Sequence, residues 1–285
     1  MRISKFIASI VSAGAILGFG STSFAADMAA SAPIYAKVPL PPAAVYDWTG
    51  LYLGGSVGGV RQQASTRYSS DPSFALFNDF AVALTTGTLA SSSSQDGAGV
   101  LGGVTAGYNW QLSSLVYGIE GDWSWTGVRA TASISPVPAF AFPVLTTNTE
   151  TRTDWLATVR GRIGFLAMPR TLLFATGGLA VGEIRASTNI VPSGGSNSCA
   201  TNAFCSSGNT SSTRAGWTVG AGVEQAFASS WTVKVEYLHY DLGRVSYIAG
   251  EASPAFPLIA VGTPNLIVNT RVSGDIGRVG VNYKF

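Results

Sequence analysis

Eight segments of this chain alternate between apolar and polar side chains, and that period of two most restricts its fold. Successive side chains of a β-strand point to opposite faces, so each segment predicts a strand with one apolar and one polar face. Between residues 231 and 240, for example, Val233 and Val235 alternate with Lys234 and Glu236. The first and fifth segments are rich in glycine, so their register could shift by one residue. The eight predicted strands are 48–61, 100–110, 115–125, 155–165, 172–185, 217–224, 231–240 and 278–285.

The connections between these segments alternate between long and short. An even-stranded barrel that spans an outer membrane needs short turns at one end and long loops at the other. A soluble β-sandwich also alternates along its strands, but it does not require this order of connections. The pattern therefore favours an all-β chain that folds as an eight-stranded antiparallel up-and-down transmembrane β-barrel. The connections are 62–96, 112–114, 128–152, 167–170, 186–213, 226–230 and 245–270.

The composition agrees with a membrane location. Charged residues make up 11% of the chain, against about 25% in ordinary soluble domains. The mean hydropathy is +0.28, yet no segment after residue 26 has an unbroken apolar run of the about 20 residues that a spanning helix needs. Backbone groups in lipid must be satisfied internally, so a closed barrel is the remaining way to cross the membrane.

The start of the chain has the three parts of a secretory signal peptide. Arg2 and Lys5 form a basic start, residues 6–20 are apolar, and the small residues Ala25 and Ala26 suit cleavage. The apolar run is too short for a spanning helix, although a retained N-terminal anchor is the alternative. Such export predicts an integral protein of the bacterial outer membrane. The predicted parts are a cleaved signal peptide at 1–25, a proline-rich periplasmic linker at 26–45 and the barrel at 46–285.

The charge balance restricts the partners. The 17 Lys and Arg residues fall to 15 when Arg2 and Lys5 are removed, which equals the 15 Asp and Glu residues. A formal net charge of zero without a clustered positive face excludes nucleic acid. The predicted partners are instead outer-membrane lipid and lipopolysaccharide.

One face of the predicted wall carries charged side chains. A barrel of eight strands has room inside only for side chains or one small ligand. Because an unpaired buried charge costs several kcal/mol, we predict that these four acids and four bases pair inside the lumen and have no catalytic role. The alternative is a narrow charged pore whose ion pairs can separate. The eight residues are Glu120, Asp122, Arg160, Arg162, Glu224, Lys234, Glu236 and Arg278.

The two cysteines of the chain, Cys199 and Cys205, lie in one long connection with five residues between them. In an exported protein such a pair predicts a disulfide that closes a short loop. A metal site needs more ligands than this loop offers, so no metal is predicted.

Residues 97–102 match the glycine-rich dinucleotide fingerprint. That pattern has meaning only between a strand and a helix of a parallel unit. Here it follows a serine-rich loop and opens an alternating strand. We therefore predict no nucleotide and no other cofactor.

The single histidine, His239, faces outward near the outer rim by parity. Barrel enzymes generally need a histidine beside Ser, Asp or Glu to activate a nucleophile. Asp241 shares the parity of His239, but no serine follows at the spacing of the small lipid A deacylase barrels. We therefore predict no catalytic residue and no enzymatic activity. The alternative role is a ligand site at the rim formed by Tyr237, His239 and Tyr240.

Several stretches resemble the porin-like outer-membrane immunogenic protein family of alphaproteobacteria, itself similar to the small barrel domain of outer-membrane protein A. The resemblance is collinear over nearly all the strands and does not cover the loops. The matching stretches are DWTGLYLGG at 47–55, GYNWQ at 107–111, YGIEGD at 117–122, VRGRIG at 159–164, ATGGLA at 175–180, residues 216–243 and RVGVNYKF at 278–285.

The resemblance implies a structural, surface-exposed antigenic barrel, and some relatives are described as haemin binders or weak porins. We therefore expect a structural protein with a charge-plugged lumen, whose outer loops form an antigenic or interaction surface toward host or envelope partners. The alternative is a narrow porin or a haem-binding receptor. The terminal aromatic Phe285 resembles the signal that the outer-membrane barrel assembly machinery recognises, so that machinery is a further predicted partner.

Overall fold

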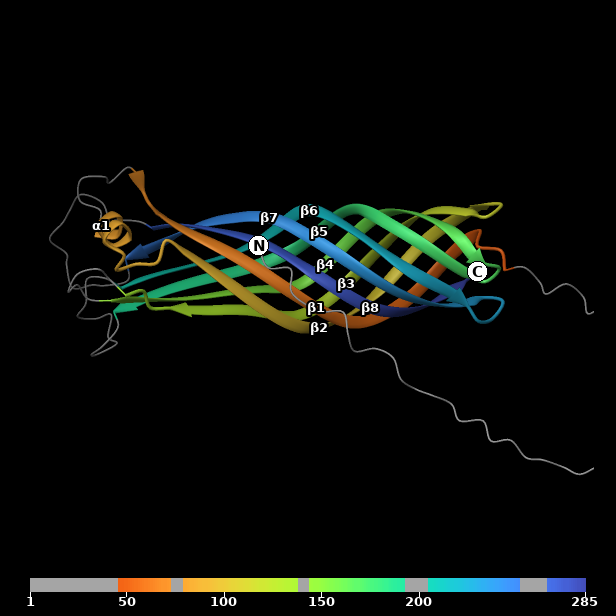
Figure 1. Cartoon of the computed structure of the whole chain (residues 1–285), viewed down its shortest axis with the longest axis horizontal. Helices are drawn as coiled ribbons and strands as arrows, with labels where there is room; N and C mark the ends of the chain where they lie inside the picture. The colour runs from red at the N-terminus through yellow and green to blue at the C-terminus, as the bar shows by residue number, and fades with distance from the viewer. Residues whose placement is uncertain (1–45, 73–78, 138–143, 193–204, 252–265) are drawn as a thin grey trace, which may run out of the picture. The chain divides into compact units, whose positions relative to one another are not determined.

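The computed structural model describes residues 46–72, 79–137, 144–192, 205–251 and 266–285. The predicted signal peptide and linker lie outside these residues. Within them, each strand hydrogen-bonds to the next in antiparallel fashion and the last strand pairs with the first, so the sheet closes into a barrel (Figure 1). The predicted fold class is therefore confirmed. The strands are β1 (Gly50–Ser70), β2 (Ser92–Leu112), β3 (Leu115–Ile134), β4 (Leu145–Met168), β5 (Thr171–Pro192), β6 (Ser206–Ala226), β7 (Trp231–Glu251) and β8 (Leu266–Lys284).

The strands are about twice as long as the sequence predicts. They contain 19 to 24 residues, whereas a segment that crosses a bilayer at a barrel's tilt needs about 9–11. With a rise of about 3.3 Å per residue and a tilt of about 40°, such strands rise roughly 50 Å, against roughly 25 Å for an apolar band. The predicted bounds of the long connections are wrong because each strand continues into them at its outer end. The connections that remain there are 71–91, 135–144, 193–205 and 252–265.

The membrane half of the barrel is apolar on its outer face and is bounded by two rows of aromatic residues, as aromatic girdles bound such bands. Rings contact one another within each row: Trp110 stacks on Tyr117 with ring centroids 5.6 Å apart, and Trp123 on Trp155 at 4.5 Å. The inner girdle contains Tyr108, Trp110, Tyr117, Trp231, Tyr283 and Phe285. The outer girdle contains Trp123, Trp125, Trp155, Trp217 and Tyr237.

Trp48 does not belong to a girdle, although its position at the start of the first predicted strand suits one. Its side chain is 2% exposed and packs edge-on against Tyr46 with ring centroids 4.8 Å apart. The backbone N–H of Trp48 donates to the Gln111 side chain at 2.8 Å. The residues before β1 therefore fold into the periplasmic mouth of the barrel. This basal cluster contains Tyr46, Trp48, Val116, Leu172, Phe174 and Ala226.

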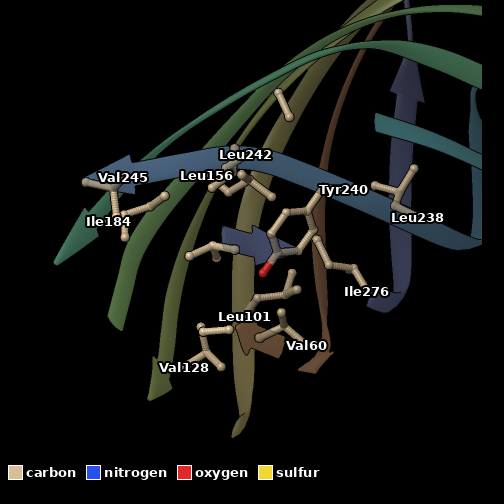
Figure 2. Packing of buried hydrophobic residues seen from close by; sticks show 13 residues of the cluster. Val60, Leu101, Val128, Leu156, Ile184, Leu238, Tyr240, Leu242, Val245 and Ile276 are labelled. Carbon is tan, nitrogen blue, oxygen red and sulfur yellow. The ribbon is translucent and has the colours of Figure 1, made fainter. Parts of the chain in front are cut away.

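In the half of the barrel farther from the periplasm, called the outer half, the alternation is inverted. Apolar side chains there point into the lumen instead of toward lipid. On β8, Val279 and Val281 are exposed on the outer face, whereas Val268 and Val272 are fully buried inside. Figure 2 shows part of the resulting core, with Tyr240 among aliphatic side chains from several strands. This central apolar layer contains Val60, Ala64, Leu101, Val128, Leu156, Ala180, Ile184, Leu238, Tyr240, Leu242, Val245, Val272 and Ile276.

A short helix, α1 (Asp79–Thr86), covers the outer end of the barrel, opposite the C-terminus in Figure 1. Ala83 and Leu89 join a second apolar cluster, and the N–H of Leu145 donates to the Thr88 carbonyl at 3.1 Å. Among the described residues, no helix is long and apolar enough to cross a membrane. This outer apolar layer contains Tyr68, Ala83, Leu89, Leu145, Ala186, Ile190, Tyr247, Ala249, Leu266 and Val268.

Candidate functional site

The structure brings together all eight charged residues that the sequence places in the lumen, and each is at most 8% exposed. Three pairs of opposite charges lie directly across the strand ladders: Glu120 opposite Arg160, Glu224 opposite Lys234, and Glu236 opposite Arg278. Register alone therefore places acids beside bases at one height of the barrel. We call these eight residues the lumen charge network.

Arg160 is the centre of the network. Its guanidinium donates to Glu236 at 2.6 Å and to Asp122 at 2.8 Å, and it also contacts Glu120. Its Nε–H donates to the Thr158 hydroxyl at 2.9 Å, and that hydroxyl donates to Asp122 at 2.6 Å. One cation thus holds carboxylates from β3 and β7, which lie on opposite sides of β4 in the sheet order.

Arg278 and Lys234 bind the same carboxylates from the other side of the lumen. Arg278 contacts Asp122 at 3.1 Å and Glu236 at 2.7 Å. The Lys234 ammonium donates to Glu120 at 2.7 Å. A buried charge is costly unless an opposite charge lies beside it, and these contacts place carboxylates beside both cations.

Arg162 and Glu224 form the periplasmic side of the network. Their side chains are 2.7 Å apart, and the Arg162 guanidinium lies 4.2 Å from the ring centroid of Phe174. The Tyr52 hydroxyl donates to Glu120 at 2.7 Å and accepts a hydrogen bond from Arg162 at 3.2 Å. The network therefore rests directly on the basal cluster.

Four uncharged polar residues hydrogen-bond to the lumen charge network, and the sequence does not predict them as site residues. Each is buried and hydrogen-bonds to one of the acids. Their inward parity is the available signal, and for Tyr52 it is obscured because the glycine-rich first strand leaves its register open. The four are Tyr52, Thr158, Thr232 and Asn282.

Apolar layers enclose the network along the barrel axis. The order of inward residues on β7 makes this plain: Lys234 and Glu236 precede Leu238, which begins the central apolar layer. The basal cluster closes the periplasmic side. Farther out, uncharged hydrogen bonds fill the lumen, such as those from Thr153 to Gln62 at 2.6 Å and from Thr151 to Gln95 at 3.0 Å. Charged, aliphatic and uncharged polar side chains thus follow one another along the axis of the described lumen.

The three predicted rim residues do not come together. Tyr237 and His239 lie on the outer face and share one oxygen of Asp275, at 2.6 Å and 2.9 Å. Tyr240 points the opposite way and is 1% exposed in the central apolar layer. Neighbouring residues of a strand cannot share a face, so Tyr240 is not part of a rim site with the other two.

Asp241 shares the outward side of β7 with His239, as predicted, but it is only 5% exposed because its carboxylate binds Arg271. A β-bulge interrupts the pairing of β7 with β8 between Asp241 and Gly243, where Gly243 has φ +75°. Glycine adopts this conformation without steric cost. The Asp241 carboxylate accepts a hydrogen bond from the Gly243 amide at 2.8 Å. The bulge shifts the parity of β7, so Arg244 faces outward beyond it.

The remaining predicted features are the disulfide and the assembly signal, whose described residues Cys205 and Phe285 lie at opposite ends of the barrel. Cys205 is fully buried, whereas Cys199 lies outside the described residues, so their disulfide stays a prediction. Phe285 is 68% exposed, and its N–H donates to the Leu51 carbonyl at 3.0 Å. Its ring meets Tyr283 edge-on with centroids 5.0 Å apart, so the last residue closes the seam between β8 and β1 within the inner girdle.

A closed antiparallel barrel with an apolar outer band between aromatic girdles defines an integral β-barrel protein of the bacterial outer membrane. The chain belongs to the outer membrane protein beta-barrel domain family, which it matches over residues 22–285. It is 32% identical to the 31 kDa outer-membrane immunogenic protein of Brucella melitensis biotype 1, over 97% of this chain and 99% of that protein. It is 24% identical to the 25 kDa outer-membrane immunogenic protein of the same organism, over the full length of both.

Among solved structures, the chain is similar to the outer membrane protein OprG from Pseudomonas aeruginosa. The similarity covers 84% of this chain and 97% of that one, with 11% identity and a TM-score of 0.45. The family match and the two Brucella relatives confirm the predicted resemblance to outer-membrane immunogenic proteins, and the protein is located in the outer membrane.

Proposed function

We propose that the protein is a structural barrel with a closed lumen, which stiffens the outer membrane and displays its outer connections. The observation that carries this proposal is the layered filling of the lumen. An ion that entered from either end would meet an apolar layer before it reached the lumen charge network.

The network itself is stable as a plug. It contains four acids and four bases, so it is neutral, and each acid contacts at least one cation within 3 Å. Separation of one pair would leave an uncompensated charge in a buried position, which costs about 3–5 kcal/mol. Ion passage by opening these pairs is therefore slow compared with passage through a water-filled pore.

The same contacts support a non-catalytic role. General acid–base chemistry needs a carboxyl within reach of a substrate. The buried carboxyls here lie beneath side-chain layers, and their oxygens already accept hydrogen bonds from cations and hydroxyls. The relatives named above are called immunogenic outer-membrane proteins, and we extend surface display to this chain on that basis.

Planar-bilayer conductance of the refolded mature chain tests the proposal. We expect no regular single-channel steps from the wild-type protein, while an open porin inserted in the same bilayer reports steps under identical conditions. Reproducible steps of uniform size from the wild-type barrel would refute the closed lumen and favour a narrow porin.

A further inference from the structure

Three arginines gather on the outer face of neighbouring strands above the outer girdle, and we call them the cationic face: Arg67 on β1, Arg244 on β7 and Arg271 on β8. All three side chains are exposed. Arg244 lies directly opposite Arg271 in the β7–β8 register. Arg271 faces Ser65 in the β8–β1 register, so Arg67, two residues farther along β1, is its diagonal neighbour.

The cationic face has fewer acidic partners than arginines. Arg271 donates to Asp241 through Nε at 3.1 Å, and within the described residues neither Arg67 nor Arg244 has an ion-pair partner. Burial raises the pKa of Asp241, but hydrogen bonds from Arg271 and the Gly243 amide outweigh it, so the pKa lies below its ordinary value. Three arginines and one aspartate therefore leave a net charge of +2. Like charges directly opposite in a sheet are destabilising, so this arrangement favours an anion between them.

The other outward arginines at this height differ. They are paired within the wall, on β1 to β5. Arg129 contacts Glu150 at 3.2 Å, and Arg185 contacts Asp154 at 3.2 Å and Glu183 at 3.1 Å. Among the described arginines on the outer face at this height, the unpaired ones thus lie on β1 and β7, beside Arg271 of β8.

Toward the bilayer, the same three strands carry two further features. The first is the hydrogen-bonded group of Tyr237, His239 and Asp275 at the level of the outer girdle. The second is a shallow apolar groove of about 450 Å³ on the lipid-facing wall, whose lining extends onto β6 and includes Gly58 and Gly277. Arg271 lies six residues beyond Gly277 on β8, which is about 15 Å farther from the bilayer at the rise and tilt of such strands.

We propose that β7, β8 and β1 form a docking surface for lipopolysaccharide of the outer leaflet. An acyl chain lies in the groove, and the phosphate and carboxylate groups of the core sugars bind the cationic face. A soluble polyanion would need only the arginines. An amphiphile fits better, because the same strands also carry the groove and the hydrogen-bonded group. Along the barrel axis these strands offer first an apolar contact, then hydrogen-bonding side chains, and then the cationic face.

The test compares two triple variants in the full mature chain, refolded into phosphatidylcholine vesicles. Arg67→Gln/Arg244→Gln/Arg271→Gln removes the cationic face. Arg129→Gln/Arg152→Gln/Arg185→Gln is the matched control, because it removes three arginines that are already paired. The probes are purified lipopolysaccharide with its core sugars, lipid A without them, and heparin as a soluble polyanion.

We expect the first variant to lose roughly tenfold or more in affinity for intact lipopolysaccharide, since one charge-assisted hydrogen bond is worth about that factor. The control should stay near the wild type, and both variants should bind lipid A equally. Unchanged affinity of the first variant for intact lipopolysaccharide would overturn the proposal, including the case in which only heparin binding falls. If the triple variant does not refold, Arg244→Gln alone keeps the Arg271–Asp241 pair and should still weaken binding.

Discussion

Replacement of Arg160 by Met tests most directly whether the lumen charge network acts as one unit. Methionine keeps most of the volume of the side chain and removes the charge. The guanidinium is fully buried and contacts three carboxylates, each of which keeps another cation: Asp122 and Glu236 keep Arg278, and Glu120 keeps Lys234. The lumen would still hold four acids and three bases, so one negative charge would lie uncompensated in a buried position.

Loss of one partner from a buried ion pair costs about 3–5 kcal/mol, or roughly two to three and a half powers of ten in the folding equilibrium constant. Urea unfolding in lipid vesicles, followed by tryptophan fluorescence, would measure this difference. The matched control is Arg185→Met, whose pairs with Asp154 and Glu183 lie on the wetted outer wall, where such pairs are worth less than about 1 kcal/mol.

A double variant separates lost charge from lost packing. Arg160→Met with Glu236→Gln restores neutrality and should recover part of the lost stability, whereas Glu236→Gln in the wild-type background should destabilise. If Arg160→Met were no more destabilising than Arg185→Met, the carboxylates would have to be solvated, and the closed lumen would be untenable.

Two further changes test the wall and the end of the chain. Val159→Arg places a charge on the lipid face between the girdles and should lower the free energy of unfolding in vesicles by about 2–4 kcal/mol. Asn148→Arg, exposed on the same face of β4 near its outer end, should cost almost nothing. Equal losses of stability in the two variants would reject the assigned membrane level. Deletion of Phe285 should cause periplasmic accumulation and degradation in cells while the purified chain still folds slowly in detergent, because the terminal ring is the expected assembly signal; normal outer-membrane levels with normal heat-modifiable gel mobility would argue against that role.

The membrane half of the fold could be predicted because most of its apolar side chains point toward lipid and its polar side chains toward the lumen. Val279 and Val281 are apolar toward lipid, and Arg278 between them is polar toward the lumen, as the pattern indicates. In the outer half of the same strand the phase is opposite, with Val268 and Val272 inside. A search for apolar-out alternation stops where the phase changes, so it assigns the outer halves of strands to loops.

The charged residues of the lumen could be predicted because parity alone places them inside, but their partners could not. Partners depend on register between strands that are distant in sequence, such as the contact of Lys234 with Glu120. The direction of the Trp48 side chain could not be predicted for a different reason. An aromatic residue beside a strand end suits a girdle by position, and only the fold of the segment before β1 directs it into the mouth of the barrel.

The change of phase along each strand has a consequence for how deeply the protein sits in the membrane. If the barrel slid inward, Arg61, Arg129 and Arg185 would enter hydrocarbon; if it slid outward, the apolar rows below the outer girdle would meet water. Both displacements cost free energy, so the barrel keeps one depth in the membrane. A thicker or thinner bilayer must therefore adapt to the protein. The outer ends of the strands, from which the outer connections leave, are thereby held at a constant height, roughly 25 Å above the hydrocarbon, since strands of about 50 Å cross a band of about half that height. A molecule that recognises them must meet them there, beyond the sugars nearest to the membrane.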